Sequence, residues 1–299
     1  MAKSELSQRV MVAAIGIPIV IAAVFFGRWA LGPALAFLAG GAALEFYRMA
    51  EHRGVRPIVL PGVVGAAALV LIAMVLPSMT LAAPVLWMAI MVLVLVLSLL
   101  AIWRRGVAGQ PLLAVAVTVF GAILPGGAMA FAVFLRHLPV GANTTGMDQE
   151  VWRALAGFAL VAYPLAVTWL TDSAAFFAGR RWGRRRLIPS VSPGKTVAGA
   201  VAGLFGGMFG GWAVTRLIAG AWLGMPLNPW LGALGGLLVA AISQMGDLAE
   251  SAWKREAGVK DSGAFFPGHG GILDRLDSLL FTIPASYWWL SMMLGGGAG

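Results

Sequence analysis

The sequence predicts an all-α fold, a polytopic integral membrane helical bundle of about nine transmembrane helices. Hydrophobic residues make up 60% of the 299-residue chain and charged residues only 11%. The mean hydropathy is +0.88. Apolar runs recur along the whole chain, and about 20 apolar residues are enough for a helix to cross the hydrocarbon core. Because membrane bundles are usually single units, residues 1–299 are expected to form one transmembrane domain.

The first apolar run is interpreted as a transmembrane helix rather than as a signal peptide. Its apolar core is longer than that of a signal sequence, and no small-x-small cleavage site follows it. Each later run is interpreted as one further span. The predicted spans cover residues 10–26, 30–48, 58–77, 80–103, 112–135, 154–178, 196–219, 229–250 and 272–295.

The basic residues set the orientation of these spans. With the N-terminus in the cytoplasm, most of the 21 Lys and Arg residues fall in cytoplasmic segments, and the four outside are Arg28, Arg136, Arg153 and Arg216. This asymmetry follows the positive-inside rule. It predicts an N-in, C-out topology, in which the polar segment near the C-terminus faces the cytoplasm.

The composition excludes several functions. Without cysteine, the chain can form no disulfide, thiolate metal site or cysteine nucleophile. The formal net charge of +9 is first a topology signal in a membrane protein, and only then an attraction for anionic lipid or phosphate. Nucleic acid is therefore not an expected partner.

Two acidic residues fall inside apolar runs, where a charge is costly. Glu45 can extend to the interface beside Arg48, at i,i+3 spacing, or it can be buried with a structural or site role. Both interpretations stay open. Asp172 is interpreted as marking a functional site, and the alternative is a helix-end carboxylate paired with Arg180 or another nearby base.

Glycines are concentrated in the seventh span. Gly203, Gly207 and Gly211 repeat every four residues, as do Gly206 and Gly210. Small residues at this spacing let helices approach closely, inside one bundle or between subunits. Packing within the bundle is the favoured interpretation, and a homodimer contact is the second.

The segment 192–196, SPGKT, invites comparison with a nucleotide-binding loop. A Walker motif needs a glycine five positions before Gly194, where the chain has proline, and no strand is expected here. A Ser-Pro-Gly turn leading into a helix still offers N–H groups and a lysine to phosphate. We therefore favour phosphate contact over helix capping alone for Ser192, Lys195 and Thr196.

Residues 243–278 form a polar stretch between apolar helices. Asp247 and Glu250 share a face at the end of the eighth span, and Asp274 and Asp277 repeat this i,i+3 spacing at the start of the ninth. Two helix ends can thus bring oxygen ligands together. Carboxylates without Cys or paired His suit Mg²⁺ or Mn²⁺ better than Zn²⁺. We therefore expect residues 1–150 to be N-terminal membrane helices and residues 151–299 to be a catalytic half with a cytoplasmic-facing polar site.

The same stretch supplies groups that bind phosphate. The glycines around His269 precede a helix, so free N–H groups and the positive end of a helix dipole can face an anion. Cations for phosphoryl oxygens come from Lys254, Arg255, Lys260 and Arg275. Phosphoryl or nucleotidyl transfer requires this combination of groups.

This stretch resembles the signature of the CDP-diacylglycerol synthases, or phosphatidate cytidylyltransferases. The matching residues are Ser251, Lys254, Arg255, Lys260, Asp261, Pro267, His269, Gly270, Gly271, Asp274, Arg275 and Asp277. Supporting matches are Asp172-Ser173 with Ala175, residues 192–196, and Gly246-Asp247. The N-terminal five helices show no diagnostic motif, and Trp253 replaces the smaller apolar residue that is usual in the family.

The resemblance implies condensation of CTP with phosphatidic acid to CDP-diacylglycerol and pyrophosphate, in phospholipid biosynthesis. It implies Mg²⁺ or Mn²⁺ held by Asp247 and Asp274, with a second cation as a further option. The implied catalytic residues are Asp247, Lys260, Asp261, His269, Asp274, Arg275 and Asp277. The implied substrate-binding residues are Asp172, Ser192, Lys195, Thr196, Ser251, Lys254, Arg255, Gly270 and Gly271. The expected location is a bacterial inner membrane, with the active site facing the cytoplasm and membrane lipids as partners.

Two alternatives stay open. A CTP-dependent lipid kinase of the polyprenol type would also use acidic and basic residues at a membrane face. A cation-coupled or proton-coupled transporter would also have intramembrane carboxylates, although transporters usually place them near the midplane at broken helices. The clustering of these residues at one predicted membrane edge favours the enzyme.

Overall fold

The computed structural model describes residues 14, 16, 18–141, 145–266 and 270–295. These residues are mostly helical, which confirms the predicted all-α membrane class. Residues 18–26 of the predicted first span are helical, and its remaining described residues are 14 and 16. Within the described ranges, six helices are long and apolar enough to cross a membrane. They are α2 (Arg28–Glu51), α4 (Met79–Arg105), α5 (Pro111–Arg136), α6 (Gln149–Trp182), α7 (Val197–Ala213) with its π-helical continuation η1 (Val214–Trp222), and α8 (Pro229–Ala257).

The chain divides into two compact units. Unit 1 contains residues 1–134 and 253–276, and unit 2 contains residues 135–252 and 277–299. The long helix α8 contributes residues to both units. The number of membrane spans and their orientation stay predictions.

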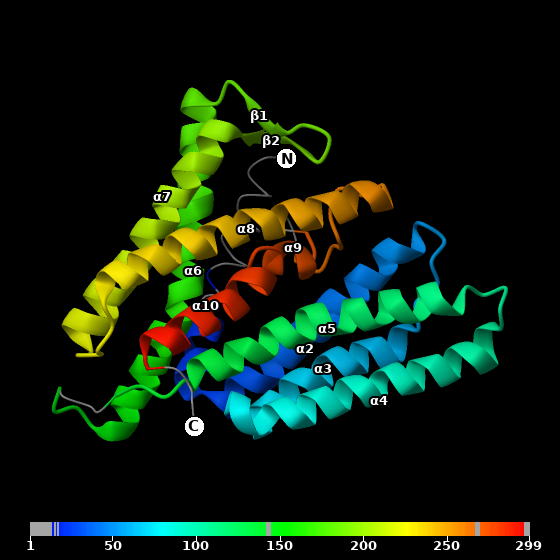
Figure 1. Cartoon of the computed structure of the whole chain (residues 1–299), viewed down its shortest axis with the longest axis horizontal. Helices are drawn as coiled ribbons and strands as arrows, with labels where there is room; N and C mark the ends of the chain where they lie inside the picture. Colours follow the sequence, from blue (N-terminus) through cyan, green and yellow to red (C-terminus); the bar gives the residue numbers. More distant parts are fainter. Residues whose placement is uncertain (1–13, 15, 17, 142–144, 267–269, 296–299) are drawn as a thin grey trace. The chain divides into compact units, whose positions relative to one another are not determined.

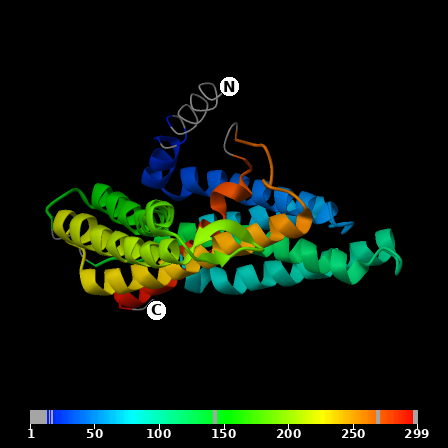
Figure 2. The ribbon, with the colours of Figure 1, turned by 90° about the horizontal axis from the view of Figure 1, so that it is seen from above.

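In unit 1, α2, α3 (Val59–Val75), α4 and α5 lie side by side (Figures 1 and 2). The buried Tyr47 hydroxyl of α2 donates a 2.7 Å hydrogen bond to the Thr118 carbonyl of α5. The indole of Trp253 makes edge contacts with Phe46 and Phe120, at ring-centroid distances of 5.9 and 5.6 Å. Such edge-to-face pairs are favourable, so an aromatic cluster accommodates the large residue that departs from the family pattern.

In unit 2, α6 packs along α7. A side chain at Gly206 would meet the Leu170 carbonyl of α6, and one at Gly207 would meet Ala240 of α8 and Thr171 of α6. The glycine repeat therefore allows close helix packing inside this unit. A homodimer contact through the same helix stays a prediction.

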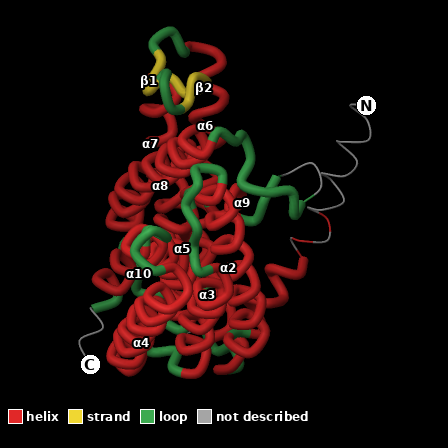
Figure 3. The backbone as a smooth tube through the Cα atoms, turned by 90° about the vertical axis from the view of Figure 1, so that its right-hand side faces the viewer, coloured by secondary structure: helices red, strands yellow, loops and turns green. Residues whose placement is uncertain are grey.

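The expectation that residues 192–196 lie in no strand was wrong. A two-stranded antiparallel hairpin joins α6 to α7 (Figure 3). Strand β1 (Arg186–Ile188) pairs with β2 (Ser192–Thr196). The turn between them begins at Pro189, a residue that presets turn geometry. The Thr196 hydroxyl then accepts a 3.1 Å hydrogen bond from the Gly199 N–H and caps α7.

The predicted ninth span, 272–295, is interrupted. A four-residue helix, α9 (Leu273–Leu276), is followed by a turn and then by α10 (Leu279–Met293). At the turn, the Ser278 N–H bonds the Asp277 carboxylate at 2.5 Å, and the Ser278 hydroxyl donates to the Ser243 carbonyl at 3.3 Å. Such side-chain bonds compete with helix continuation. The expectation that Asp274 and Asp277 share one helix face is therefore wrong.

Candidate active site

An ion pair in unit 2 joins the hairpin to α8. The Lys195 ammonium of β2 lies 2.5 Å from Oδ2 of Asp247, and the two side chains are 25% and 33% exposed. The other Asp247 oxygen, Oδ1, is 3.4 Å from the Ser251 hydroxyl, one turn further along α8. The pair is therefore partly shielded but still accessible to a ligand.

This ion pair lies in a pocket of about 770 Å³, within the range of about 300–1,000 Å³ typical of ligand sites. Three cations and two carboxylates line it, together with hydroxyl, amide and glycine groups. The lining residues are Asp172, Ala175, Phe176, Gly179, Arg180, Gly183, Arg186, Leu187, Ser192, Gly194, Lys195, Thr196, Gly199, Ala200, Gln244 and Asp247. Guanidinium and ammonium groups in a partly enclosed cavity suit a phosphorylated ligand.

The acidic side of this pocket is concentrated around α6 and α8. Asp172 lines the pocket and is within electrostatic range of Asp277, Asp247 and Lys195. Glu250, predicted to share a face with Asp247, is 1% exposed and is not among the lining residues. Neighbouring carboxylates disfavour a bare polyanion, so this pocket suits a phosphate that arrives with a cation.

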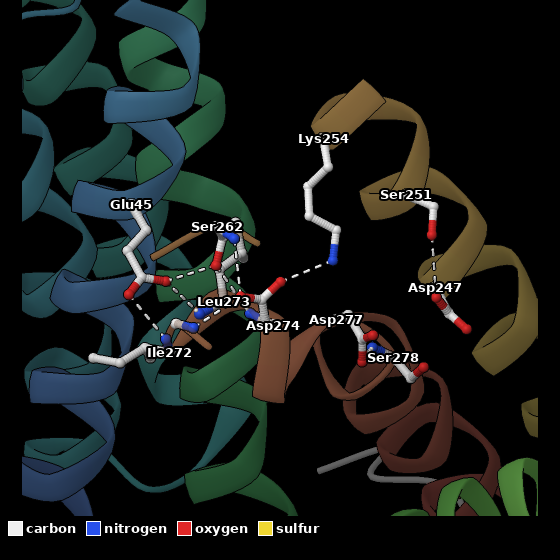
Figure 4. A network of polar contacts seen from close by, with 11 residues as sticks. Glu45, Asp247, Ser251, Lys254, Ser262, Ile272, Leu273, Asp274, Asp277 and Ser278 are labelled. Atoms are coloured by element: carbon white, nitrogen blue, oxygen red, sulfur yellow. Dashed lines mark hydrogen bonds and ion pairs between the residues drawn. The ribbon is translucent and has the colours of Figure 1, made fainter. Parts of the chain in front are cut away.

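Unit 1 contains the second group of signature residues, centred on Asp274. Its Oδ1 accepts a 2.8 Å hydrogen bond from the Lys254 ammonium. Its Oδ2 accepts from the N–H groups of Ser262 and Gly271, at 2.9 and 2.8 Å (Figure 4). Asp274 is only 8% exposed. Both carboxylate oxygens are thus engaged by groups of the protein itself.

Asp274 lies outside the helices that are long enough to span the membrane. The groups around its carboxylate determine its charge state. Burial opposes the charged form. The hydrogen bond and charge of Lys254 and the N–H groups of Gly271 and Ser262 outweigh burial, and lower the pKa of Asp274 below its ordinary value. The carboxylate is therefore held ionised well into the acidic range.

The Asp274 group also includes a residue from the N-terminal half. Glu45 of α2 is 5% exposed and accepts a 2.9 Å hydrogen bond from the Ser262 hydroxyl. It accepts two more from the N–H groups of Ile272 and Leu273, at 2.9 and 2.8 Å (Figure 4). Of the two interpretations left open by the sequence, the structure shows the buried one. The signal in the sequence was a carboxylate inside an apolar run.

The remaining predicted residues fall into three groups. Arg255, Lys260, Asp261 and Arg275 are exposed. Gly270 has a positive φ of 83°, and its carbonyl accepts a 2.9 Å hydrogen bond from the Phe266 N–H. His269, with Pro267 and Gly268, lies outside the described residues.

The structure also bears on how a divalent cation would be held. Within the described ranges, no three Asp, Glu or His side chains converge as a metal-ligand group. Mg²⁺ usually takes one or two carboxylates and completes its shell with waters and substrate phosphates. Asp247 fits this pattern, because its carboxylate is one-third exposed in a pocket suited to phosphate. Asp274 could bind a cation through Oδ1 only after Lys254 releases it.

Comparison with known proteins identifies relatives over nearly the whole chain. The sequence pattern of the Cytidylyltransferase family matches residues 7–293. A phosphatidate cytidylyltransferase of Synechocystis is 32% identical over 308 aligned positions, which cover 96% of this chain and 97% of that protein. A phosphatidate cytidylyltransferase of Bacillus subtilis is 40% identical over 46% of this chain, about half (49%) of that protein's length. The uncharacterized protein YnbB of Escherichia coli is 39% identical over 59% of this chain and 53% of its own length.

Proposed function

The chain belongs to the cytidylyltransferase family, and from this premise we propose that it condenses CTP with phosphatidic acid to form CDP-diacylglycerol and pyrophosphate. The observation that supports this most directly is the pocket of about 770 Å³ around the Lys195–Asp247 ion pair. It offers cations for phosphate oxygens beside a carboxylate for a divalent ion. Nucleotidyl transfer requires both.

In this proposal the pocket of unit 2 binds the triphosphate of CTP. Arg180, Arg186 and Lys195 provide the cations, and Ser192 provides a hydroxyl. Lys195 is paired with Asp247. A triphosphate with its cation would offer a phosphate oxygen to Lys195 and a positive charge to Asp247. Binding of the nucleotide with its cation would thus replace the Lys195–Asp247 ion pair by two pairs, Lys195 with phosphate and Asp247 with the cation. No charge would be left unpaired.

The reaction needs little proton transfer. An oxygen of the phosphatidate headgroup attacks the α-phosphorus of CTP, a new P–O bond forms, and the bond to the β-phosphate breaks to release pyrophosphate. The nucleophile is already an anion and pyrophosphate is a weakly basic leaving group, so no strong general base is required. The task of the protein is to position both substrates and to compensate the negative charge.

We propose that the required cation is Mg²⁺, or Mn²⁺, and that Asp247 is its first protein ligand. The bound ion would polarise the phosphoryl oxygens and stabilise the leaving pyrophosphate. Binding of a cation by Asp274 and binding of a second cation remain part of the same hypothesis. Asp247 and Asp274 belong to different units, so their action on one ion stays a prediction.

The proposal is tested with purified protein, Mg²⁺, phosphatidate in mixed micelles, and CTP labelled at either the α- or the γ-phosphate. Cytidylyl transfer places the α-label in the lipid and the γ-label in pyrophosphate. A CTP-dependent lipid kinase, given a polyprenol in place of phosphatidate, would place the γ-label in that lipid and release CDP. A transporter would give no labelled lipid with either substrate. Either of the last two results would refute the proposal.

We also propose that the protein resides in the bacterial inner membrane with this pocket on the cytoplasmic side. Bacterial relatives and six long apolar helices support an integral membrane protein. The arginine-rich connection between α6 and the hairpin, with Arg184 and Arg185 exposed, supports the cytoplasmic side through the positive-inside rule. CTP would then reach the pocket from the cytosol, and phosphatidate would enter from the bilayer.

A further inference from the structure

Glu45 lies in α2, far in sequence from the signature residues that its carboxylate contacts. It is separated by 217 residues from Ser262 and by 228 residues from Leu273. All of its contacts described above lie within unit 1. A charged side chain within an apolar helix is costly, so such a carboxylate persists where it has compensating donors. Here two of those donors are N–H groups of the turn that precedes Asp274, and the third is the Ser262 hydroxyl.

Ser262 links Glu45 directly to Asp274. Its hydroxyl donates to Glu45 Oε2 and accepts a 3.2 Å hydrogen bond from the Asp274 N–H. Its own N–H donates to Asp274 Oδ2. The N–H groups of Ile272 and Leu273, which donate to Glu45, immediately precede Asp274 in the chain. Glu45 therefore fixes both the backbone before Asp274 and the serine that contacts Asp274 twice.

The donor and acceptor pattern at Glu45 requires a carboxylate. Oε1 faces the Ile272 N–H, while Oε2 faces the Leu273 N–H and the Ser262 hydroxyl. A glutamine amide has one acceptor oxygen and one NH₂ donor. Whichever way the amide is turned, its NH₂ group faces a backbone N–H, and that N–H loses its acceptor. Glutamine thus keeps the size of the side chain but disrupts the arrangement.

From this geometry we infer that Glu45 is a positioning residue for catalysis, which acts through Ser262 and residues 271–273 to hold Asp274 and its partner Lys254 in place. This inference rests on the proposed function. The N-terminal helices would then do more than anchor the enzyme, because α2 supplies a fixed support for the signature residues. Supporting groups of this kind typically change activity by about 10–100-fold when they are altered.

The test compares Glu45→Gln with Glu51→Gln, a matched change at the exposed end of the same helix. We expect Glu45→Gln to lower kcat by about 10–100-fold, with unchanged KM for CTP and phosphatidate, at a temperature where the variant remains folded. Glu51→Gln should behave as wild type. Equal kcat in both variants would overturn the inference.

Ser262→Ala provides a second route if Glu45→Gln does not fold, because it removes only the linking hydroxyl. We expect a smaller loss of kcat, and a Glu45→Gln/Ser262→Ala double variant no worse than the more impaired single variant, as for residues that act through one another. Fully additive losses of kcat in the double variant would overturn the inference that Glu45 acts through Ser262. A purely structural Glu45 would lower the melting temperature but leave kcat per folded molecule unchanged.

Amide hydrogen exchange separates this inference from the proposed function, because it needs no turnover. Glu45→Gln should accelerate exchange in a peptide containing Ile272 and Leu273, whereas Glu51→Gln should not. Unchanged exchange in Glu45→Gln would show that Glu45 does not hold this turn, even if the wild type is an active cytidylyltransferase. Accelerated exchange in a protein without cytidylyltransferase activity would instead refute the proposed function alone.

Discussion

Replacing Lys254 by methionine tests the Asp274 group most directly. The Lys254 and Asp274 side chains are 16% and 5% exposed, so the pair is largely shielded from water. Methionine keeps most of the side-chain volume but removes the charged donor from Asp274 Oδ1. Removing one partner of a buried pair typically costs about 3–5 kcal/mol. Asp274 keeps two backbone N–H donors on Oδ2, so we expect a smaller cost of about 2–3 kcal/mol, near that of one charge-assisted hydrogen bond.

The measurement is thermal unfolding in detergent at neutral pH. At about 2–4 °C per kcal/mol for a unit of this size, Lys254→Met should lower the melting temperature by about 4–12 °C. Lys260→Met is the matched control, since Lys260 is exposed, and it should change stability by less than about 0.5 kcal/mol. Equal melting temperatures for the two variants would refute the inference that this pair stabilises unit 1.

The pH dependence of the same pair has a definite sign. The folded-state pKa of Asp274 is lowered, so its contribution to stability is fully present above the unfolded value of about 3.9. It is lost as the pH falls through the folded pKa. The stability difference between wild type and Lys254→Met should therefore be constant from pH 6 to 8 and shrink below about pH 4. A difference that grows on acidification would contradict the assigned cause.

Two further predictions concern the pocket of unit 2, and a third concerns the membrane topology. Asp247→Asn should lower cytidylyl transfer by orders of magnitude without unfolding, and near wild-type turnover at moderate Mg²⁺ would remove Asp247 from the metal hypothesis. Lys195→Ala should impair CTP affinity or turnover much more than Arg185→Ala in the neighbouring basic segment; equal mild effects would favour a topology role for both. In this cysteine-free chain, Arg184→Cys should react with impermeant thiol reagents only from the cytoplasmic side and Arg153→Cys only from the opposite side, and the reverse labelling would invert the topology.

The fold class was predictable because hydrophobicity over long windows largely determines whether a chain enters a membrane. The positions at which the helices are interrupted were not predictable. The hairpin at residues 186–196 has short strands, and its main signal is the turn at Pro189. The break before α10 depends on Ser278, whose hydroxyl bonds the Ser243 carbonyl 35 residues away. A contact between residues so far apart in the sequence cannot be detected in the local hydrophobic periodicity.

The site was predictable only where residues of a suitable chemical type also have a recognisable spacing along the chain. Lys195 and Asp247 were both identified, but their ion pair depends on the hairpin, which periodicity did not predict. Glu45 was identified as a costly carboxylate without a definite role, because two of its three donors are backbone N–H groups. Any residue type other than proline can provide a backbone N–H. Ile272 and Leu273 therefore could not be identified as its partners by residue type.

The two signature aspartates differ in how they are held, and this difference suggests a division of tasks. Asp274 is nearly buried and receives three donors from the protein, one of them a lysine. Asp247 is more exposed, lies in a ligand-sized pocket, and has a lysine and a more distant serine as its described partners. A ligand that displaces fewer existing hydrogen bonds meets a smaller desolvation and reorganisation cost. Asp247 would therefore hold a cation at a lower cost than Asp274 would, whereas Asp274 holds the Lys254 ammonium in a fixed position.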